Sequence, residues 1–335
     1  MAPVCEDGAM HRAAVPEQQD GWDGQAGWDP VAADVARRAL VDHTTASRRA
    51  SRQVIAHYST SFGLATRLLG EPVRHRVRSL YALVRVADEI VDGAAAGAGL
   101  GPEAIGALLD DHEARTEAAL ATGYSTDPVV HAFADAARAC GITPELTRPF
   151  YASMRADLQV AEHDERTFEE YVYGSAEVVG LMCLHAFATD DAPTPVAPSP
   201  DLVEGARRLG AAFQKVNFLR DLAEDTDGRG RAYFPGLDPA SLSTVHRDAL
   251  VADIRADLAV ADAVIPRLPD SSRTAVRACH DLYAALTDRL ARTPAHALRT
   301  RRVRVPDARK AAIVGRAVVR ERCGGLPRIG REETR

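Results

Sequence analysis

Cysteine is scarce in this sequence, and its placement excludes two common kinds of site. The five cysteines are scattered and form no Cys-x-x-Cys pair; they are Cys5, Cys140, Cys183, Cys279 and Cys323. A disulfide framework or a structural zinc site is therefore not expected, and unpaired thiols are typical of a protein of the reducing cytoplasm.

The sequence also lacks the segments that direct a chain to a membrane or to nucleic acid. Glu6 and Asp7 stand where a signal peptide carries positive charge, and no apolar segment follows them. No run of about 20 apolar residues occurs that would span a membrane. The formal net charge is −6, so no basic excess indicates nucleic acid. We expect a cytoplasmic protein without a nucleic-acid partner.

Aromatic residues are few as well, and strand-like alternation is absent over any useful length. The chain is 46% hydrophobic but only 5% aromatic, and from Val31 onward apolar residues recur at helical spacing between Gly- and Pro-rich breaks. This pattern predicts an all-α fold of about ten helices. Residues 1–30 read as a disordered N-terminal tail, 31–322 as one helical domain, and 323–335 as a flexible C-terminal tail.

Two helical segments reverse the usual amphipathic pattern, because their polar residues form a narrow stripe on an apolar helix. At about 100° per residue, each stripe falls within an arc of about 80°. The first stripe consists of Arg85, Asp88 and Asp92; the second consists of Gln214, Asn217, Asp221 and Asp225. Since a helix that is apolar nearly all round is buried, we expect these carboxylates to face an internal cavity.

Buried carboxylates at i and i+4 repel each other unless cations lie between them. Hard oxygen ligands of this type suit Mg²⁺, which completes its coordination with water and phosphate oxygens. Arg78, Arg85 and Arg220 supply planar guanidinium groups that match phosphate. The pattern therefore favours a diphosphate carried on Mg²⁺, and the alternative is a set of ordinary surface carboxylates.

Two flanking segments carry further polar and aromatic residues. After the second stripe, residues 225–235 combine glycines with Arg229, Arg231, Tyr233 and Phe234, which suits either a flap that closes over phosphate or an ordinary helix end. Upstream, Ser59 and Ser61 could donate to a diphosphate and Phe62 could face a cation, or the hydroxyls could simply cap a helix.

Taken in order, the motifs resemble the signatures of the squalene and phytoene synthase family, the head-to-head trans-isoprenyl diphosphate synthases. They are Ser-x-Ser-Phe at 59–62, Tyr-x-x-x-Arg-x-x-Asp-x-x-x-Asp at 81–92, Tyr-Val-Tyr-Gly-Ser-Ala-Glu-Val-Val-Gly at 171–180, Gln-x-x-Asn-x-x-Arg-Asp-x-x-x-Asp at 214–225 and Arg-x-Tyr-Phe at 231–234. The resemblance runs from about His57 to Lys310. It implies a single-domain isoprenoid-synthase-type helical bundle whose central cavity is flanked by two Asp-rich helices.

The resemblance also implies roles by position. Mg²⁺, or alternatively Mn²⁺, would be held by Asp88, Asp92, Asn217, Asp221 and Asp225. Catalytic roles would fall to Tyr81, Arg85, Tyr171, Arg220 and Tyr283. Contacts with the prenyl diphosphates would come from Tyr58, Ser59, Thr60, Ser61, Phe62, Tyr81, Arg85, Gln214, Arg220, Arg231, Tyr233, Arg302 and Lys310. Lys310 draws notice because the chain has only two lysines.

The implied activity is the head-to-head condensation of two prenyl diphosphates through a cyclopropylcarbinyl diphosphate, with release of diphosphate. The segment 174–180, followed by Leu-Met-Cys-Leu, resembles bacterial phytoene synthases most closely. This favours two geranylgeranyl diphosphates, phytoene as product, and a role in carotenoid biosynthesis. Glu177 departs from the small residue that many members carry, so it either changes the chain accepted or points outward.

Other activities remain open beside this one. Squalene or dehydrosqualene synthesis from two farnesyl diphosphates is the alternative within the family. A terpene cyclase or chain-elongating synthase also uses aspartates on helices, but its usual aspartate pattern differs from that of Asp88 and Asp92. From another class, the chain could be a non-catalytic prenyl-diphosphate-binding or assembly protein, which should lack one or more of the metal ligands.

Two further features of the sequence bear on the cofactor requirement and on contact with a membrane. No Gly-rich dinucleotide fingerprint is present, so we expect the reaction to end in proton loss without NADPH. The basic helix around Arg309 to Arg322 indicates one of two things: a peripheral contact with anionic lipid at the inner face of the membrane, or an arginine face in contact with water. A membrane contact would give an oily product a route of release. The pattern favours no particular oligomeric state.

Overall fold

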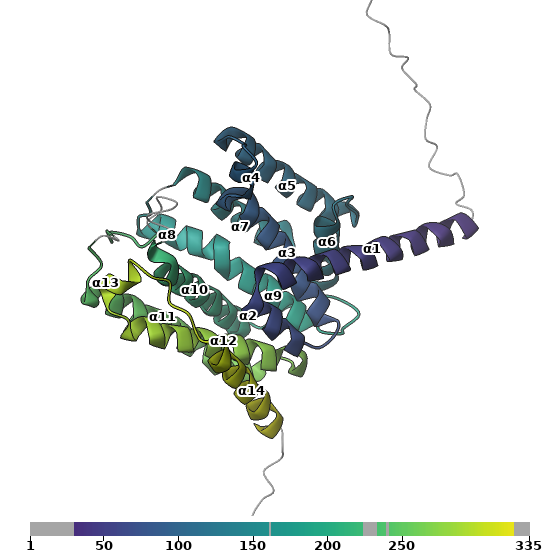
Figure 1. The fold of residues 1–335 in the computed structure, drawn as a ribbon. Coiled ribbons are helices and arrows are strands. Elements are labelled where there is room, and N and C mark those ends of the chain that lie inside the picture. The colour runs from purple at the N-terminus through teal and green to yellow at the C-terminus, as the bar shows by residue number, and fades with distance from the viewer. Residues whose placement is uncertain (1–29, 161, 224–232, 239–240, 325–335) are drawn as a thin grey trace, which may run out of the picture. The chain divides into compact units, whose positions relative to one another are not determined.

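The computed structural model describes residues 30–160, 162–223, 233–238 and 241–324 (Figure 1). These residues form α-helices with short 3₁₀ and π segments and contain no β-strand, which confirms the all-α prediction. The helices are α1 (Pro30–Tyr58), α2 (Thr60–Ala65), α3 (Val73–Asp92), α4 (Ala94–Gly97), α5 (Pro102–Thr122), α6 (Pro128–Cys140), α7 (Pro144–Gln159), α8 (Glu165–Val172), α9 (Val178–Thr189), α10 (Pro200–Ala223), α11 (Thr244–Val264), α12 (Asp270–Arg292), α13 (Ala295–Leu298) and α14 (Asp307–Gly324).

The chain divides into two compact units, Met1–Val41 and Asp42–Arg335. The boundary falls inside α1, so the first unit holds the beginning of that helix. The second unit holds the end of α1 and every later helix, and with them all the predicted site residues that the structure describes.

Capping side chains begin, and glycines end, several helices where the sequence predicted breaks. Asp127 caps the N-terminus of α6, and its Oδ1 accepts hydrogen bonds from the N–H groups of Val129 at 2.7 Å and Val130 at 3.1 Å. Gly123 and Gly141 end α5 and α6 with left-handed φ angles of 81° and 72°, which glycine adopts without strain.

The described part of the chain holds more helices than the ten or so expected, because short helices form inside predicted connections. Helix α4 lies within residues 93–102 and α13 within residues 292–306, two of the Gly- or Pro-containing breaks between the predicted helices. A further break, between α7 and α8, contains neither glycine nor proline. It is fixed by a capping box, in which the N–H of Thr167 donates to Asp164 Oδ1 at 2.7 Å and the N–H of Asp164 donates to Thr167 Oγ1 at 2.9 Å.

Helix α8 runs through a π-helical turn, Tyr173–Glu177, into α9. This path, Glu165–Thr189, is the one stretch among the described helices that is long and apolar enough to cross a membrane, judged by length and composition alone. The sequence had shown no such run. More than half of the apolar window is buried inside the fold, as in the core helix of a globular bundle.

Glycines bring α10 unusually close to α9 and to the π turn. A Cβ placed on Gly210 would lie 2.5 Å from the carbonyl oxygen of Ala176, and one on Gly180 would lie 2.6 Å from that of Ala206. Both distances are far below van der Waals contact, so no larger residue fits without moving a backbone.

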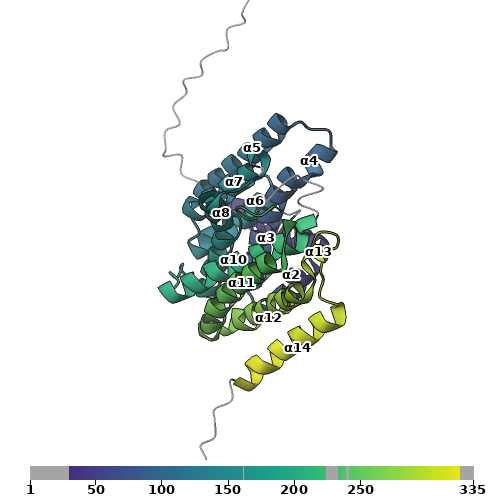
Figure 2. The ribbon, with the colours of Figure 1, turned by 90° about the vertical axis from the view of Figure 1, so that its left-hand side faces the viewer.

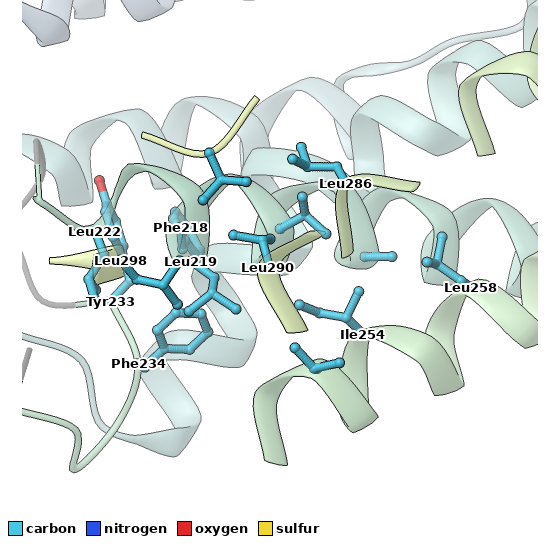
Figure 3. Packing of buried hydrophobic residues seen from close by; sticks show 14 of the residues in the cluster. Phe218, Leu219, Leu222, Tyr233, Phe234, Ile254, Leu258, Leu286, Leu290 and Leu298 are labelled. Carbon is cyan, nitrogen blue, oxygen red and sulfur yellow. The ribbon is translucent and has the colours of Figure 1, made fainter. Parts of the chain in front are cut away.

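A large apolar cluster fixes the other side of α10 (Figure 3). Phe218, Leu219 and Leu222 of α10 pack there with residues of neighbouring helices, including Ile254, Leu258, Leu286, Leu290 and Leu298. Figures 1 and 2 show α10, α11 and α12 side by side, with α14 against α12. Helix α10 is thus held between this cluster and the π turn, and its remaining face is free to line a cavity.

Candidate functional site

An apolar cavity of about 310 Å³ lies among helices α2, α3, α9, α10, α11 and α12. Along α10 its wall runs from Leu202 to Asn217, a span of roughly 22 Å at the helical rise of about 1.5 Å per residue. Most of the wall consists of Leu, Val, Ala and Ile side chains. A long apolar cavity of this kind suits a linear hydrocarbon chain.

Aromatic rings gather at one end of the cavity. The ring of Phe62 lies 6.3 Å from that of Tyr81 on α3 and 6.2 Å from that of Tyr283 on α12. Phe213 of α10 stacks on Tyr283 at 3.7 Å, and Asn217 lines the same end. Burial raises the pKa of Tyr283 to about 12, so its hydroxyl stays protonated at neutral pH. Ring faces of this kind stabilise a cation held between them.

The α3 stripe lies at the rim of this end. Cavity lining on α3 stops at Val84, and Arg85 Nη1 donates to Asp88 Oδ2 at 2.6 Å. The Arg85 guanidinium also contacts Glu89 and lies 4.5 Å from the centre of the Tyr58 ring. The side chains of Arg85 and Asp88 are each 31% exposed. The sequence placed these carboxylates inside the cavity, whereas the structure places Asp88 beyond the last lining residue of α3, Val84. The helix itself stays packed on another face, through Ala87 and Val91.

The α10 stripe continues from the same aromatic end, and two arginines hold its central carboxylate. Asp221 Oδ1 accepts from Arg220 Nε at 2.9 Å and pairs with Arg302 Nε at 2.8 Å. One turn earlier, Asn217 Oδ1 is buried without a hydrogen-bond partner in the part of the chain that the structure describes. An unpaired amide oxygen beside a carboxylate matches the oxygen ligands that Mg²⁺ prefers.

The oxygen groups at the rim fit a divalent cation in their chemistry. Among the described residues, no group of three or more His, Cys, Asp or Glu side chains is close enough to hold a metal ion, and Asp225 lies outside those residues. The carboxylates of Asp88 and Asp221 are instead neutralised by arginines. A phosphate-bearing ligand would compete for these arginines and release the carboxylates for a cation.

Other predicted residues occupy less central places. Ser59 caps α2, where its Oγ accepts from the N–H of Phe62 at 3.1 Å, and its O–H remains able to donate. Gln214 lines the cavity. Lys310 pairs with Asp307 on its own helix at 3.0 Å. The side chains of Thr60 and Ser61, together with Asp225 and Arg231, lie outside the described residues.

Tyr171 and Tyr233 meet at a carboxylate that the sequence did not single out. The hydroxyl of Tyr171 donates to Asp157 Oδ2 at 2.9 Å, and that of Tyr233 donates to Oδ1 at 3.1 Å. Burial and the charge of Asp157 raise the pKa of Tyr171 well above its usual value, so this phenol remains a donor. Neither tyrosine lines the apolar cavity. No local pattern marks Asp157, because its partners come from distant segments.

Phe213 and Glu177 occupy positions that sequence periodicity could not settle. Phe213 is apolar and lies outside the polar stripe of its helix, yet it lines the cavity beside Gln214. Glu177 does not line the cavity, although its neighbours Ser175 and Ala176 do. Its Oε2 accepts from Arg207 Nε at 2.7 Å instead. Glu177 therefore points away from the cavity, toward Arg207, with a side chain that is 13% exposed.

Replacing Glu177 by alanine should leave the length of the product chain unchanged. The pair with Arg207 is partly exposed, so its loss should lower the free energy of unfolding by less than about 1 kcal/mol. Product mass and the urea unfolding midpoint measure the two effects. Ser175→Leu is the matched comparison, since it adds a side chain within the cavity wall and should reduce turnover of long substrates. A shorter or longer product from Glu177→Ala would contradict the outward placement.

Sequence comparisons point to one family of enzymes. A family model described as squalene/phytoene synthase matches residues 55–309. A 15-cis-phytoene synthase of Synechocystis sp. is 34% identical over 206 residues, which cover 59% of this chain and 58% of that protein. A 4,4'-diapophytoene synthase of Staphylococcus haemolyticus is 30% identical over 184 residues, which cover 54% and 60%. The matched region thus spans less than two thirds of these relatives.

Solved structures share the arrangement of helices. A dehydrosqualene synthase in complex with a ligand superposes with a TM-score of 0.68 at 20% identity, covering 85% of this chain and 99% of that one. A squalene synthase from Alicyclobacillus acidocaldarius gives a TM-score of 0.63 at 18% identity, covering 76% and 95%. At such low identity the likeness shows a common fold.

Proposed function

The chain belongs to the squalene/phytoene synthase family, and we propose that it condenses two prenyl diphosphates head to head. The observation that carries the proposal is the long apolar cavity with aromatic rings at one end and arginine-bound carboxylates at its rim. Such a site accepts a molecule that is hydrocarbon along its length and strongly anionic at its head.

At the rim, Arg85, Arg220 and Arg302 would donate to diphosphate oxygens in place of their present carboxylate partners. Asp88, Asp92, Asn217 and Asp221 would hold Mg²⁺, which when bound would neutralise the diphosphate and weaken the bond between C1 and oxygen. In this proposal the three arginines would supply positive charge where negative charge develops as the leaving group departs.

Inside the cavity, the rings of Phe62, Phe213 and Tyr283 would face the allylic cation left by that departure. The apolar wall would exclude water, which otherwise captures such a cation. Attack by the double bond of the second substrate and loss of a proton would give the cyclopropylcarbinyl diphosphate. A second ionisation, rearrangement and proton loss would join the two C1 carbons. Each half-reaction releases one diphosphate and one proton, so no reductant is needed.

Two geranylgeranyl diphosphates are the substrates that we propose, with phytoene as the product in carotenoid biosynthesis. Phytoene synthases among the relatives support this choice. Two farnesyl diphosphates are the second candidate, since the relatives also include a 4,4'-diapophytoene synthase. We further propose a cytoplasmic protein that touches the membrane through exposed arginines of α14, namely Arg309, Arg316 and Arg320.

Product mass decides between these candidates. The purified chain would be incubated with geranylgeranyl or farnesyl diphosphate and Mg²⁺, with and without NADPH, and the extracted hydrocarbon weighed by mass spectrometry. We expect a C40 hydrocarbon without NADPH. A C30 product alone would assign the farnesyl reaction instead. Tight binding of either substrate without any hydrocarbon would favour a non-catalytic binding protein.

A further inference from the structure

A second cavity, of about 390 Å³, lies where the end of α1, helix α2 and helix α3 meet. It shares Ile55 and Thr66 with the apolar cavity, so the two are neighbours. Its wall differs in character, because three arginines line it: Arg52 of α1, Arg67 of the 3₁₀ turn after α2, and Arg78 of α3. We call this cavity the arginine pocket.

The three arginines of this pocket have no anionic partner in the part of the chain that the structure describes. Within the described residues, no ion pair or hydrogen bond satisfies the guanidinium groups of Arg52, Arg67 or Arg78. The Nε of Arg78 is buried without an acceptor. A buried donor left unpaired costs about 1–3 kcal/mol, and more when it is charged. An anion in the pocket would recover that free energy.

The charges around Arg78 show the same shortage of anions. Burial and, after it, the charges of Arg74 and Arg52 lower the pKa of Arg78. The carboxylate that opposes them is Glu71, and it already contacts Arg74 Nη1 at 3.3 Å and His75 Nδ1 at 3.4 Å. Positive charge in and around the pocket therefore exceeds negative charge.

We propose that the arginine pocket binds a phosphate or diphosphate group without the help of a metal ion. Guanidinium groups match phosphate oxygens with paired hydrogen bonds, and three of them converge here beside the Ser59 hydroxyl. No acidic side chain among the described residues lines the pocket, so none of them would hold Mg²⁺ there. On α3, Arg78 precedes Arg85 by two turns, roughly 10 Å, which separates this site from the carboxylate rim.

The occupant would be either free diphosphate or the phosphate headgroup of a lipid. The proposal does not depend on the condensation reaction, since a chain that makes no hydrocarbon would still carry the pocket. Its location beside the prenyl cavity matters, because Ile55 and Thr66 belong to both walls. An anion bound in the pocket would therefore lie against the same side chains as a hydrocarbon in the cavity.

Isothermal titration of the full chain in excess EDTA tests the proposal. Inorganic diphosphate is one probe, and vesicles containing phosphatidic acid, measured by flotation, are the other. We expect at least one probe to bind, and Arg78→Gln or Arg67→Gln to weaken that binding about tenfold, the loss expected for one charge-assisted hydrogen bond. Arg67 is exposed, so its replacement keeps the test valid if Arg78→Gln does not fold.

Two controls separate this pocket from the carboxylate rim. Arg115→Gln removes an exposed arginine of α5 and should leave binding unchanged. Arg85→Gln removes an arginine of the rim and should leave metal-free binding in the arginine pocket unchanged. The proposal is overturned if neither probe binds in EDTA, or if binding survives both Arg67→Gln and Arg78→Gln. Binding that is lost in Arg85→Gln but kept in Arg78→Gln would place the anion at the rim and overturn it as well.

Discussion

Replacement of Asp221 by alanine should lower hydrocarbon formation by about a thousandfold, comparable to the removal of a principal electrostatic group from an active site. Asp221 lies at the rim of the cavity, where its carboxylate oxygens are held by Arg220 and Arg302. It is the described carboxylate nearest along α10 to the unpaired oxygen of Asn217. Without it, the proposed cation would lose a charged ligand and the two arginines would lose the group that orients them.

The fold should survive this change, because the arginines left behind are not deeply buried. The side chains of Arg220 and Arg302 are 22% and 38% exposed, so water can satisfy them. Circular dichroism and the urea midpoint check the fold, and product yield at saturating Mg²⁺ checks activity. Asp288→Ala is the matched control, since Asp288 pairs with Arg255 between α11 and α12 and lies outside the cavity wall. Full activity in Asp221→Ala would remove this residue from the proposed metal site.

Part of this site could be predicted, because its residues recur at helical spacing within single segments of the sequence. Three- and four-residue spacing placed Arg85 with Asp88, and Asn217 with Asp221, on common stripes, and Arg85 does donate to Asp88. Periodicity cannot tell where along a helix the lining of a cavity ends. The carboxylates were therefore expected inside the cavity, although the lining of α3 stops at Val84.

Features built from distant segments left no comparable signal. Asp157 becomes distinctive only when Tyr171 and Tyr233 are brought to it, and the three arginines of the second pocket converge only through the turn that follows α2. The break between α7 and α8 depends on one capping box in place of glycine or proline. In each case the information lies in tertiary contacts, which single-helix patterns do not contain.

Replacement of Gly210 by alanine should give a large loss of stability for so small a change, about 2 kcal/mol in the free energy of unfolding. The new Cβ would lie 2.5 Å from the carbonyl oxygen and 2.9 Å from the carbonyl carbon of Ala176. These are backbone atoms of the π turn, so no side-chain rotation relieves the clash. Helix α10 would have to move away from the turn, against the apolar cluster that holds its other side.

Two other glycines provide matched controls for this prediction. At Gly205 the new Cβ would lie even closer to an atom, 2.1 Å, but that atom is Cγ2 of Val264, which can rotate away. Gly106 in α5 has no neighbouring atom within 4 Å of the new Cβ, so Gly106→Ala should gain up to about 1 kcal/mol from helix propensity. We expect Gly205→Ala to fall between Gly106→Ala and Gly210→Ala in urea unfolding midpoints.

This order of stabilities tests what sets the cost of adding a Cβ to the glycines of α10: the contact distance alone, or contact with backbone atoms. If distance alone set the cost, Gly205→Ala would be the most damaging of the three, whereas the backbone contact makes Gly210→Ala the worst. Gly210 also lines the cavity, so a shift of α10 would change the space beside Phe213 and Asn217. Activity should therefore fall in Gly210→Ala even at temperatures where the variant is fully folded. Equal stability of Gly210→Ala and Gly106→Ala would mean that α10 does not press against the π turn.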